Sequence, residues 1–381
     1  MTNSKKKILI ACDSSKTLLG FRGKLIEELI KTNEVHVFTP KISDAFTSQT
    51  LKKLNVTVHE NKLMGSNVTI LSDLRYIIAL YRLMKQIKPE IFFPYTFKPV
   101  IYGTVIAKIC KVKRITPMLT GLGYNFSAQN KKKNLVSKIT RMLLKYSLFN
   151  DRRMTIIFQN KDDYNNLVES KIIGLKHHTS VVNGSGVDLT HYEFSLPNTK
   201  NISFLMIARL INAKGINEFY EAAKLVKLNF PNAKFKLIGP YDDNIDAIND
   251  ELYQKIKLGN VIEYLGEVND IRPFIQKASV IVLPSYYGEG VPRCLLEGMA
   301  TGRPIITCDS VGCRETVIAV PDKKNGFLIP IKNISALATK MDYYLTHTKE
   351  IIDNGINGRL YAQQKFDVNL VNAEMLKIMN A

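Results

Sequence analysis

Short apolar runs alternate along the chain with longer stretches in which apolar positions recur at helical spacing. Such alternation is typical of parallel sheets whose strands are joined by helices. In the first half, the pattern predicts strands at residues 8–12, 35–39, 91–94, 114–119, 155–159 and 180–182, and helices at 24–30, 71–87, 99–110 and 135–149.

A second series of the same kind begins after a polar connection that follows Asp188. It predicts strands at residues 204–207, 235–239, 261–265, 280–283, 304–308 and 327–330, separated by helices such as 216–228. Repeated βα units imply parallel sheets with helices on both faces. We therefore expect an α/β chain of two doubly wound, Rossmann-like domains, residues 1–190 and 191–362, with their ligand-binding strand ends facing one cleft.

Length and composition fit two globular domains. The chain has 381 residues, 45% apolar and 23% charged, and its longest apolar region, residues 91–110, is broken by Pro94, Lys98 and Pro99. No segment is therefore expected to span a membrane, and the apolar run near the N-terminus is too short for a signal peptide. Five cysteines without metal-ligand spacing indicate free thiols, and a cytoplasmic location is expected.

The segment PSYYGEGVPRCLLEGMATG, residues 284–302, carries the most specific chemistry. It follows a buried apolar run and places Glu289 on a loop and Glu297 eight positions later on a helix, which Pro292 begins and Gly302 ends. Unpaired amides and the positive dipole end at the helix start favour a phosphate. The two carboxylates can accept hydrogen bonds from sugar hydroxyls, whereas the alternative is an exposed glutamate pair.

Two cations, Arg209 and Lys214, follow the first strand of the second series. In a cleft they can neutralise a departing diphosphate, and the alternative is a pair of exposed surface cations. The chain contains no Asp-x-Asp sequence. We therefore expect catalysis without a metal and without any other cofactor, with nucleotide sugar as substrate only.

The stretch EGVPRCLLEGMA resembles the E-x7-E signature of the retaining family 4 glycosyltransferases, and the resemblance extends along most of the chain. It implies the two-domain fold called GT-B, with the last segment, residues 363–381, packing back on the first domain. It also implies that Glu289 holds the donor hexose, Glu297 the ribose, and Arg209 and Lys214 the diphosphate. The catalytic residues expected are Glu289, Arg209 and Lys214.

The resemblance also supplies the wider donor site. The loop at 266–270 resembles the nucleobase contact of the family, and Gly20 stands where many members have two adjacent glycines. The predicted donor-binding residues are Gly20, Arg209, Lys214, Val268, Asp270, Glu289, Gly290, Val291, Pro292, Arg293, Leu296 and Glu297. The family's histidine after the strand ending near Leu119 is replaced by Thr120-Gly121.

Acceptor residues are expected after two strands of the first domain. The sequences around Lys98 and Tyr102, and around Thr120, Gly121, Gly123 and Tyr124, resemble members that build bacterial capsule, O-antigen or N-glycan units on undecaprenyl-diphosphate sugars. Glycines permit close backbone approach, although a Gly-x-Gly sequence is equally compatible with a plain turn. The implied reaction moves a hexose, expected to be an N-acetylated amino sugar, from a UDP-sugar to such an acceptor.

Positive charge is concentrated in the first domain. Residues 1–200 contain 32 Lys and Arg against 14 Asp and Glu, a net of +18 out of the +19 of the whole chain. The segment 130–154 combines eight cations with a stripe formed by Leu135, Ile139, Met142, Tyr146 and Phe149. This pattern predicts peripheral attachment to an anionic membrane, the inner face of the plasma membrane, unless the stripe belongs to the core.

Other functions are less well supported. No nucleic-acid-binding motif is present, and neither first βα turn has the G-x-G-x-x-G of dinucleotide enzymes. Two alternatives share the expected architecture: an isomerase like the UDP-sugar 2-epimerases, and a protein that binds a sugar nucleotide without transferring the sugar. Turnover of UDP-sugar without an acceptor would favour the isomerase.

Overall fold

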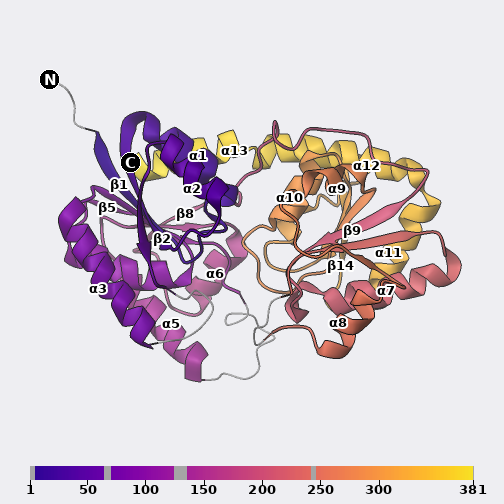
Figure 1. Cartoon of the computed structure of the whole chain (residues 1–381), viewed down its shortest axis with the longest axis horizontal. Helices are drawn as coiled ribbons and strands as arrows, with labels where there is room; N and C mark the ends of the chain where they lie inside the picture. Colours follow the sequence, from indigo (N-terminus) through magenta and orange to yellow (C-terminus); the bar gives the residue numbers. More distant parts are fainter. Residues whose placement is uncertain (1–4, 64–69, 124–134, 242–245, 381) are drawn as a thin grey trace. The chain divides into compact units, whose positions relative to one another are not determined.

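A computed structural model of the chain describes residues 5–63, 70–123, 135–241 and 246–380. Two compact units are present, Met1–Ser185 together with Val371–Ala381, and Gly186–Leu370 (Figure 1). These bounds differ by a few residues from the predicted division at 190 and 191 and the predicted return from residue 363. We call them unit 1 and unit 2.

Unit 1 is built on parallel strands. A five-stranded sheet has the order β3-β2-β1-β4-β5, and β6, β7 and β8 form a second, three-stranded sheet. The strands are β1 (Lys6–Ala11), β2 (Asn33–Pro40), β3 (Thr57–Asn61), β4 (Ile91–Pro94), β5 (Arg114–Ile115), β6 (Met118–Leu119), β7 (Thr155–Phe158) and β8 (His178–Val181). The prediction of a single strand at 114–119 is wrong, because two short strands, β5 and β6, are separated there by Thr116 and Pro117. Proline has no backbone N–H and cannot donate a hydrogen bond to a neighbouring strand.

In the part of unit 1 that the structure describes, the helices include the predicted ones and two that were not predicted, α2 and α6. They are α1 (Leu18–Thr32), α2 (Ala45–Lys53), α3 (Ile70–Ile87), the π-helix η1 (Pro99–Gly103) running into α4 (Thr104–Ile109), α5 (Leu135–Ser147) and α6 (Lys161–Glu169). The last helix, α13 (Val368–Asn380), brings Val371, Met375 and Met379 into the same apolar core as Ile8 and Ile10 of β1.

Unit 2 contains one six-stranded parallel sheet of order β11-β10-β9-β12-β13-β14. Its strands are β9 (Ser203–Ile207), β10 (Lys234–Ile238), β11 (Glu263–Tyr264), β12 (Val280–Leu283), β13 (Ile305–Cys308) and β14 (Gly326–Ile329). Its helices are η3 (Asn212–Lys214), α7 (Ile216–Asn229), α8 (Asp250–Lys257), α9 (Arg272–Lys277), α10 (Arg293–Ala300), η4 (Arg314–Thr316), η5 (Pro321–Lys323), α11 (Ile334–Thr346), α12 (Thr348–Tyr361) and η6 (Ala362–Phe366).

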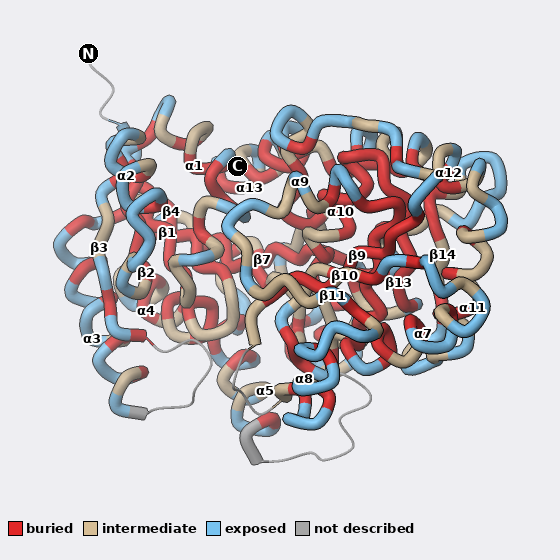
Figure 2. The backbone as a smooth tube through the Cα atoms, turned by 45° about the vertical axis from the view of Figure 1, so that its right-hand side comes forward, coloured by how far each residue is buried: buried red, intermediate tan, exposed pale blue. Residues whose placement is uncertain are grey.

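Helices cover both faces of the six-stranded sheet of unit 2. In Figure 1, α10 and α12 lie on one side of β9 and β14, and α7, α8 and α11 lie on the other. The central strands are the most buried, as Figure 2 shows: all residues of β12 and β13 are buried, and all four residues of β12 are at most 1% exposed. The predicted fold class, two doubly wound parallel α/β domains, is confirmed.

The strand order fixes where loops converge in unit 2. The sheet continues from β9 to β10 on one side and from β9 to β12 on the other. Because all strands are parallel, the loops that follow β9 and β12 leave the same edge at the point where the winding reverses. Ligands of open α/β sheets bind at this point.

Candidate functional site

Glu289 and Lys214 meet at the reversal point of unit 2. Lys214 ends η3 after β9, and Glu289 lies on the loop between β12 and α10. Lys214 Nζ donates to Glu289 Oε1, and Ser285 Oγ donates to the same oxygen at 3.0 Å. The two charged side chains are only 15% and 13% exposed. The structure thus brings two predicted site residues together and adds Ser285, which the sequence analysis missed.

The ion pair keeps Lys214 charged. Burial lowers the pKa of Lys214, but the attraction of the Glu289 carboxylate and the hydrogen bond that Lys214 donates to it outweigh this effect, so the pKa is raised above its ordinary value. Lys214 Nζ also lies 5.2 Å from the centre of the Tyr287 ring, within cation–π distance. Arg209 is exposed at the end of β9, and its charge opposes the rise in the Lys214 pKa. Two cations of the predicted diphosphate site therefore act on each other here.

Backbone packing explains why residues so far apart in sequence meet. Gly215 follows Lys214 with a φ of 80°, and a Cβ there would lie 2.3 Å from the carbonyl oxygen of Pro284. Only glycine allows this approach. The amide of Tyr286 also donates to the carbonyl of Ala213 at 2.8 Å. The loops after β9 and β12 are therefore held together by their main chains.

Glu297 forms a second buried cluster on α10. The carboxylate is 5% exposed, and its Oε1 accepts from Tyr192 Oη at 2.9 Å, Arg293 Nη2 at 2.8 Å and Arg293 Nε at 3.0 Å. Burial lowers the pKa of Arg293, but Glu297 and Tyr192 more than compensate, so the pKa is raised. Arg293 and Glu297 lie one helical turn apart, and Tyr192 is a further residue that the sequence analysis missed.

The predicted residues around the start of α10 divide into two groups. Gly290, Val291 and Pro292 are buried on the loop that leads from Glu289 into the helix. Pro292 is the N-cap residue, so its predicted place at the first helical position is wrong by one residue. Leu296 is fully buried in the core of unit 2, where its side chain anchors the helix.

Gly312 supports the Glu289 loop from the neighbouring strand. It follows β13 with a φ of 76°, and a Cβ there would lie 2.4 Å from the carbonyl oxygens of both Glu289 and Gly290. Ser310 Oγ, on the same loop, donates to the carbonyl of Ser285 at 2.7 Å. A glycine and a small polar residue just after a buried strand were the available sequence signals for this contact.

The predicted nucleobase residues lie further along the same sheet edge. Asp270 is bound by Arg272 through Nη2 at 2.8 Å and Nε at 2.9 Å, and this pairing lowers the pKa of Asp270. Val268 is half-buried against the core. Both follow β11, which β10 separates from β9 in the sheet of unit 2, so they lie two strands away from the loop that carries Lys214.

In unit 1, an unpredicted acid joins two predicted acceptor residues. Asp73 of α3 is 7% exposed and accepts from Lys98 Nζ at 2.8 Å and from Tyr102 Oη at 2.9 Å. Burial raises the pKa of Tyr102, and the hydrogen bond to Asp73 adds to this effect. Asp73 is the only acid in α3, and this isolation was the sequence signal for a specific role.

The remaining acceptor residues follow β6. Gly121 and Gly123 have φ values of 114° and 63°, which glycine adopts without strain, and Thr120 is half-buried beside them. A parallel bridge between Tyr95 and Met118 sets the end of β4 beside β6. The segments that carry Lys98 and Thr120 therefore leave adjacent strands, whereas Tyr124 lies outside the described residues.

Gly20 does not lie on the loop after β1. It is an exposed residue in the first turn of α1.

The apolar stripe of α5 faces solvent. Ile139, Met142 and Tyr146 of α5 are 42%, 64% and 71% exposed, and Phe149, just past the end of the helix, is 72% exposed, while Leu144 and Leu148 belong to the core. The alternative that this stripe belongs to the core is therefore wrong for these four residues. The side chain of Leu135 and the lysines at 131–133 lie outside what the structure describes.

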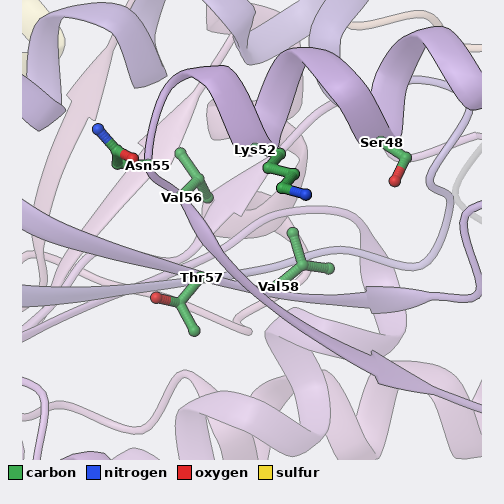
Figure 3. Close-up of a pocket in the computed structure, with 6 residues that line it drawn as sticks. All are labelled: Ser48, Lys52, Asn55, Val56, Thr57 and Val58. Atoms are coloured by element: carbon green, nitrogen blue, oxygen red, sulfur yellow. The ribbon is translucent and has the colours of Figure 1, made fainter.

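Two hollows in unit 1 contain none of the predicted site residues. The hollow in Figure 3, about 450 Å³, lies between α2 and β3 and is lined by Ser48, Lys52, Asn55, Val56, Thr57 and Val58. Another, about 380 Å³, lies between the end of α5 and residues 168–177.

Among the described residues, no cluster of three or more histidine, cysteine or acidic side chains could hold a metal ion. Within those same ranges, no helix is long and apolar enough to cross a bilayer.

Two protein families match successive parts of the chain. The family described as "Glycosyl transferase 4-like" matches residues 7–160, and the family described as "Glycosyl transferases group 1" matches residues 190–364. The first match falls within unit 1, and the second falls within unit 2.

Individual relatives extend over most of the chain. An N,N'-diacetylbacillosaminyl-diphospho-undecaprenol alpha-1,3-N-acetylgalactosaminyltransferase of Campylobacter jejuni is 27% identical over 377 residues, 95% of each chain. A UDP-Gal:alpha-D-GlcNAc-diphosphoundecaprenol alpha-1,3-galactosyltransferase of Escherichia coli is 26% identical over 71% of this chain and 70% of its own.

Solved structures share the fold. Anabaena HepE, crystallised with UDP and glucose, superposes with a TM-score of 0.76 at 18% identity over 98% of this chain and 99% of its own. A sucrose-phosphate synthase of Thermosynechococcus elongatus gives a TM-score of 0.79 at 18% identity over 98% of both chains.

Proposed function

Because the chain belongs to the group 1 glycosyltransferases, we propose that it transfers a hexose from a UDP-sugar to an undecaprenyl-diphosphate-linked sugar. The relatives from Campylobacter jejuni and Escherichia coli are named for acceptors of this class, and the latter for a UDP-sugar donor. The sugar proposed is an N-acetylated amino sugar, and the pathway is capsule, O-antigen or related surface-glycan synthesis. The assignment to surface-glycan synthesis is supported by a capsular polysaccharide biosynthesis glycosyltransferase of Staphylococcus aureus that is 24% identical over 98% of this chain.

The observation that carries the proposal is the meeting of the Lys214–Glu289 and Arg293–Glu297 pairs around one loop and helix start in unit 2. Lys214 and Arg209 would neutralise the diphosphate that leaves, together with the amides at the start of α10. Glu289 would accept hydrogen bonds from the hexose. Glu297 has its three described hydrogen bonds on Oε1, so Oε2 is the oxygen we assign to the ribose.

Catalysis would proceed with retention of anomeric configuration and without a metal. The cations of the chain take the place of a divalent ion, since no Asp-x-Asp sequence is available to hold one. The departing phosphate would help to deprotonate the acceptor hydroxyl on the same face of the sugar. Lys98 would bind the acceptor diphosphate, with the exposed stripe of α5 holding the enzyme peripherally on the inner face of the plasma membrane.

A substrate panel tests the proposal. The protein is incubated with different UDP-sugars and short-chain polyprenyl-diphosphate sugars, with and without EDTA, and products are identified by mass spectrometry. We expect a disaccharide product that EDTA does not abolish, and NMR of the new bond reports its configuration. Epimerised donor without acceptor, or no product with any pair, would overturn the assignment.

A matched pair of variants tests the site. Lys214→Met should lower kcat on the order of a hundredfold or more, because it removes charge stabilisation of the leaving group. Lys236→Met removes another ion pair of unit 2, Lys236 Nζ to Glu263 Oε2 at 3.0 Å, and should leave kcat unchanged. Equal activities of the two variants would show that Lys214 does not serve the reaction.

A further inference from the structure

The outer face of α3 is apolar where a surface helix is normally polar. Leu71, Leu74, Ile78 and Tyr81 are 71%, 51%, 43% and 40% exposed, and their spacing of three and four residues places them on one side of the helix. The opposite side is also apolar, since Tyr76, Leu80, Leu83, Met84 and Ile87 pack in the core of unit 1. A helix that is apolar on both sides needs an apolar neighbour on its outer side.

The charges around this face have one sign. Arg75, Arg82 and Lys85 are exposed on α3, whereas the only acid of the helix, Asp73, is buried. From Ile91 to Asn150 the sequence contains no acidic residue and eleven Lys and Arg. This stretch supplies η1, α4 and α5, and both α3 and α5 pack against η1. A second copy of the chain would place like charges against each other, so an anionic lipid surface is the complementary partner.

The buried side of α3 carries a different function. Asp73 binds Lys98 and Tyr102, the residues predicted to meet the acceptor diphosphate. An α-helix with side chains is about 10–12 Å across, and the polar layer of one bilayer leaflet is roughly 5–8 Å deep. If the outer face of α3 rests on the membrane, Lys98 lies about one helix diameter from it. A diphosphate attached to a membrane-embedded lipid can reach that level.

We infer that α3 is a membrane-docking helix: its outer face, Leu71, Leu74, Ile78 and Tyr81 with the flanking cations, seats on an anionic bilayer alongside the stripe of α5. Asp73 on its inner face is a positioning residue that fixes Lys98 and Tyr102 at the height of the acceptor diphosphate. The docking is inferred from the exposed apolar side chains of α3 and the positive charges beside them, whereas the role of Asp73 rests on the proposed function.

Vesicle sedimentation tests the docking face. The double variant Leu74→Glu/Ile78→Glu should bind vesicles of mixed phosphatidylglycerol and phosphatidylcholine at least about tenfold more weakly than the unaltered protein, because it replaces apolar contact with like charge. Leu228→Glu alters a side chain of α7 that is 78% exposed and should bind as the unaltered protein does. Thermal unfolding verifies that each variant is folded. Unchanged binding of the double variant would overturn the inference, as would a dimer in sedimentation velocity that this variant dissociates.

Activity measurements separate the two faces of α3. The double variant should retain activity on a short-chain, water-soluble acceptor and lose it on a long-chain acceptor in vesicles. Asp73→Asn should bind vesicles normally but raise KM for both acceptors with a smaller effect on kcat. Equal loss on both acceptors in the double variant, or an unchanged KM in Asp73→Asn, would refute the arrangement. If no acceptor gives product with the unaltered enzyme, the proposed function fails, while the vesicle result still decides the docking.

Discussion

Replacing Gly312 by alanine probes the support of the Glu289 loop without touching a charged group. The new Cβ would lie 2.4 Å from the carbonyl oxygens of Glu289 and Gly290, whereas real Cβ contacts stay beyond 3.0 Å. The loop must therefore retreat by 0.6 Å, the difference between these two distances. Because the obstacle is main chain on both sides, no side-chain rotation relieves it.

Two effects of known size follow. A non-glycine residue in the left-handed region costs about 1–2 kcal/mol, which lowers Tm by roughly 2–4 °C per kcal/mol in a unit of this size. The shift also moves Glu289 relative to Lys214. A misplacement of about 1 Å at a reacting centre costs on the order of a hundredfold, so a smaller shift should lower kcat/KM roughly tenfold.

Gly259 provides the matched control for this experiment. It is also in unit 2 and has a φ of 73°, but a Cβ there meets nothing within 4 Å. Gly259→Ala should therefore lose only the stability that the left-handed backbone costs and keep its activity, whereas Gly312→Ala should lose at least as much stability and also lose activity. Thermal unfolding and steady-state kinetics at saturating acceptor are compared for the two variants. Full activity in Gly312→Ala at the same loss of stability would refute the reasoning that this loop carries the donor.

Two further predictions concern stability. Arg303 is fully buried and donates to the carbonyls of Ser195, Ile275, Gln276 and Thr301. Arg303→Met should therefore lower the free energy of unfolding, measured by urea titration, by about 3–5 kcal/mol. A loss below about 1 kcal/mol would contradict this. Burial raises the pKa of Asp163 from its ordinary 3.8 to about 7. The folded state therefore holds a proton that the unfolded chain releases earlier, so stability is full below pH 4 and falls as pH rises through 7. Between pH 5.5 and 8 the loss should be roughly 2 kcal/mol, and Asp163→Asn should remove it; identical pH dependence in the variant would exclude Asp163 as the cause.

The parts of the fold that depend on local patterning were predictable from the sequence. Strands β4 and β12 and the start of α7 occur where the apolar runs indicate, because a strand buried on both faces must be apolar throughout. Strand β3 was missed because its sequence, TVHEN, is polar and only partly buried at the sheet edge. Helices α2 and α6 were missed because few of their residues are buried, so the periodic signal is weak.

The sequence pointed to the charged residues of the candidate site, and the structure pairs two of them, Lys214 and Glu289, but the residues that support them were not predictable. A spacing motif identifies Glu289 and Glu297, but nothing local in the sequence links Tyr192 to Glu297 or Asp73 to Lys98. These contacts depend on how separate βα units pack. The same holds for Leu296, whose place on α10 was right while its side chain belongs to the core.

The path of the chain has a consequence for its synthesis. Unit 1 begins at the N-terminus but takes its last helical segment from Val371 onward, so all of unit 2 is translated before that piece emerges. At 5–20 residues per second, the ribosome needs roughly 10–40 s for the intervening stretch. Until then, the core of unit 1 that Ile8 and Ile10 of β1 share with Met375 and Met379 is incomplete. The first lobe therefore stays incomplete during most of translation, and a stop codon before Met375 would destabilise the lobe that is made first.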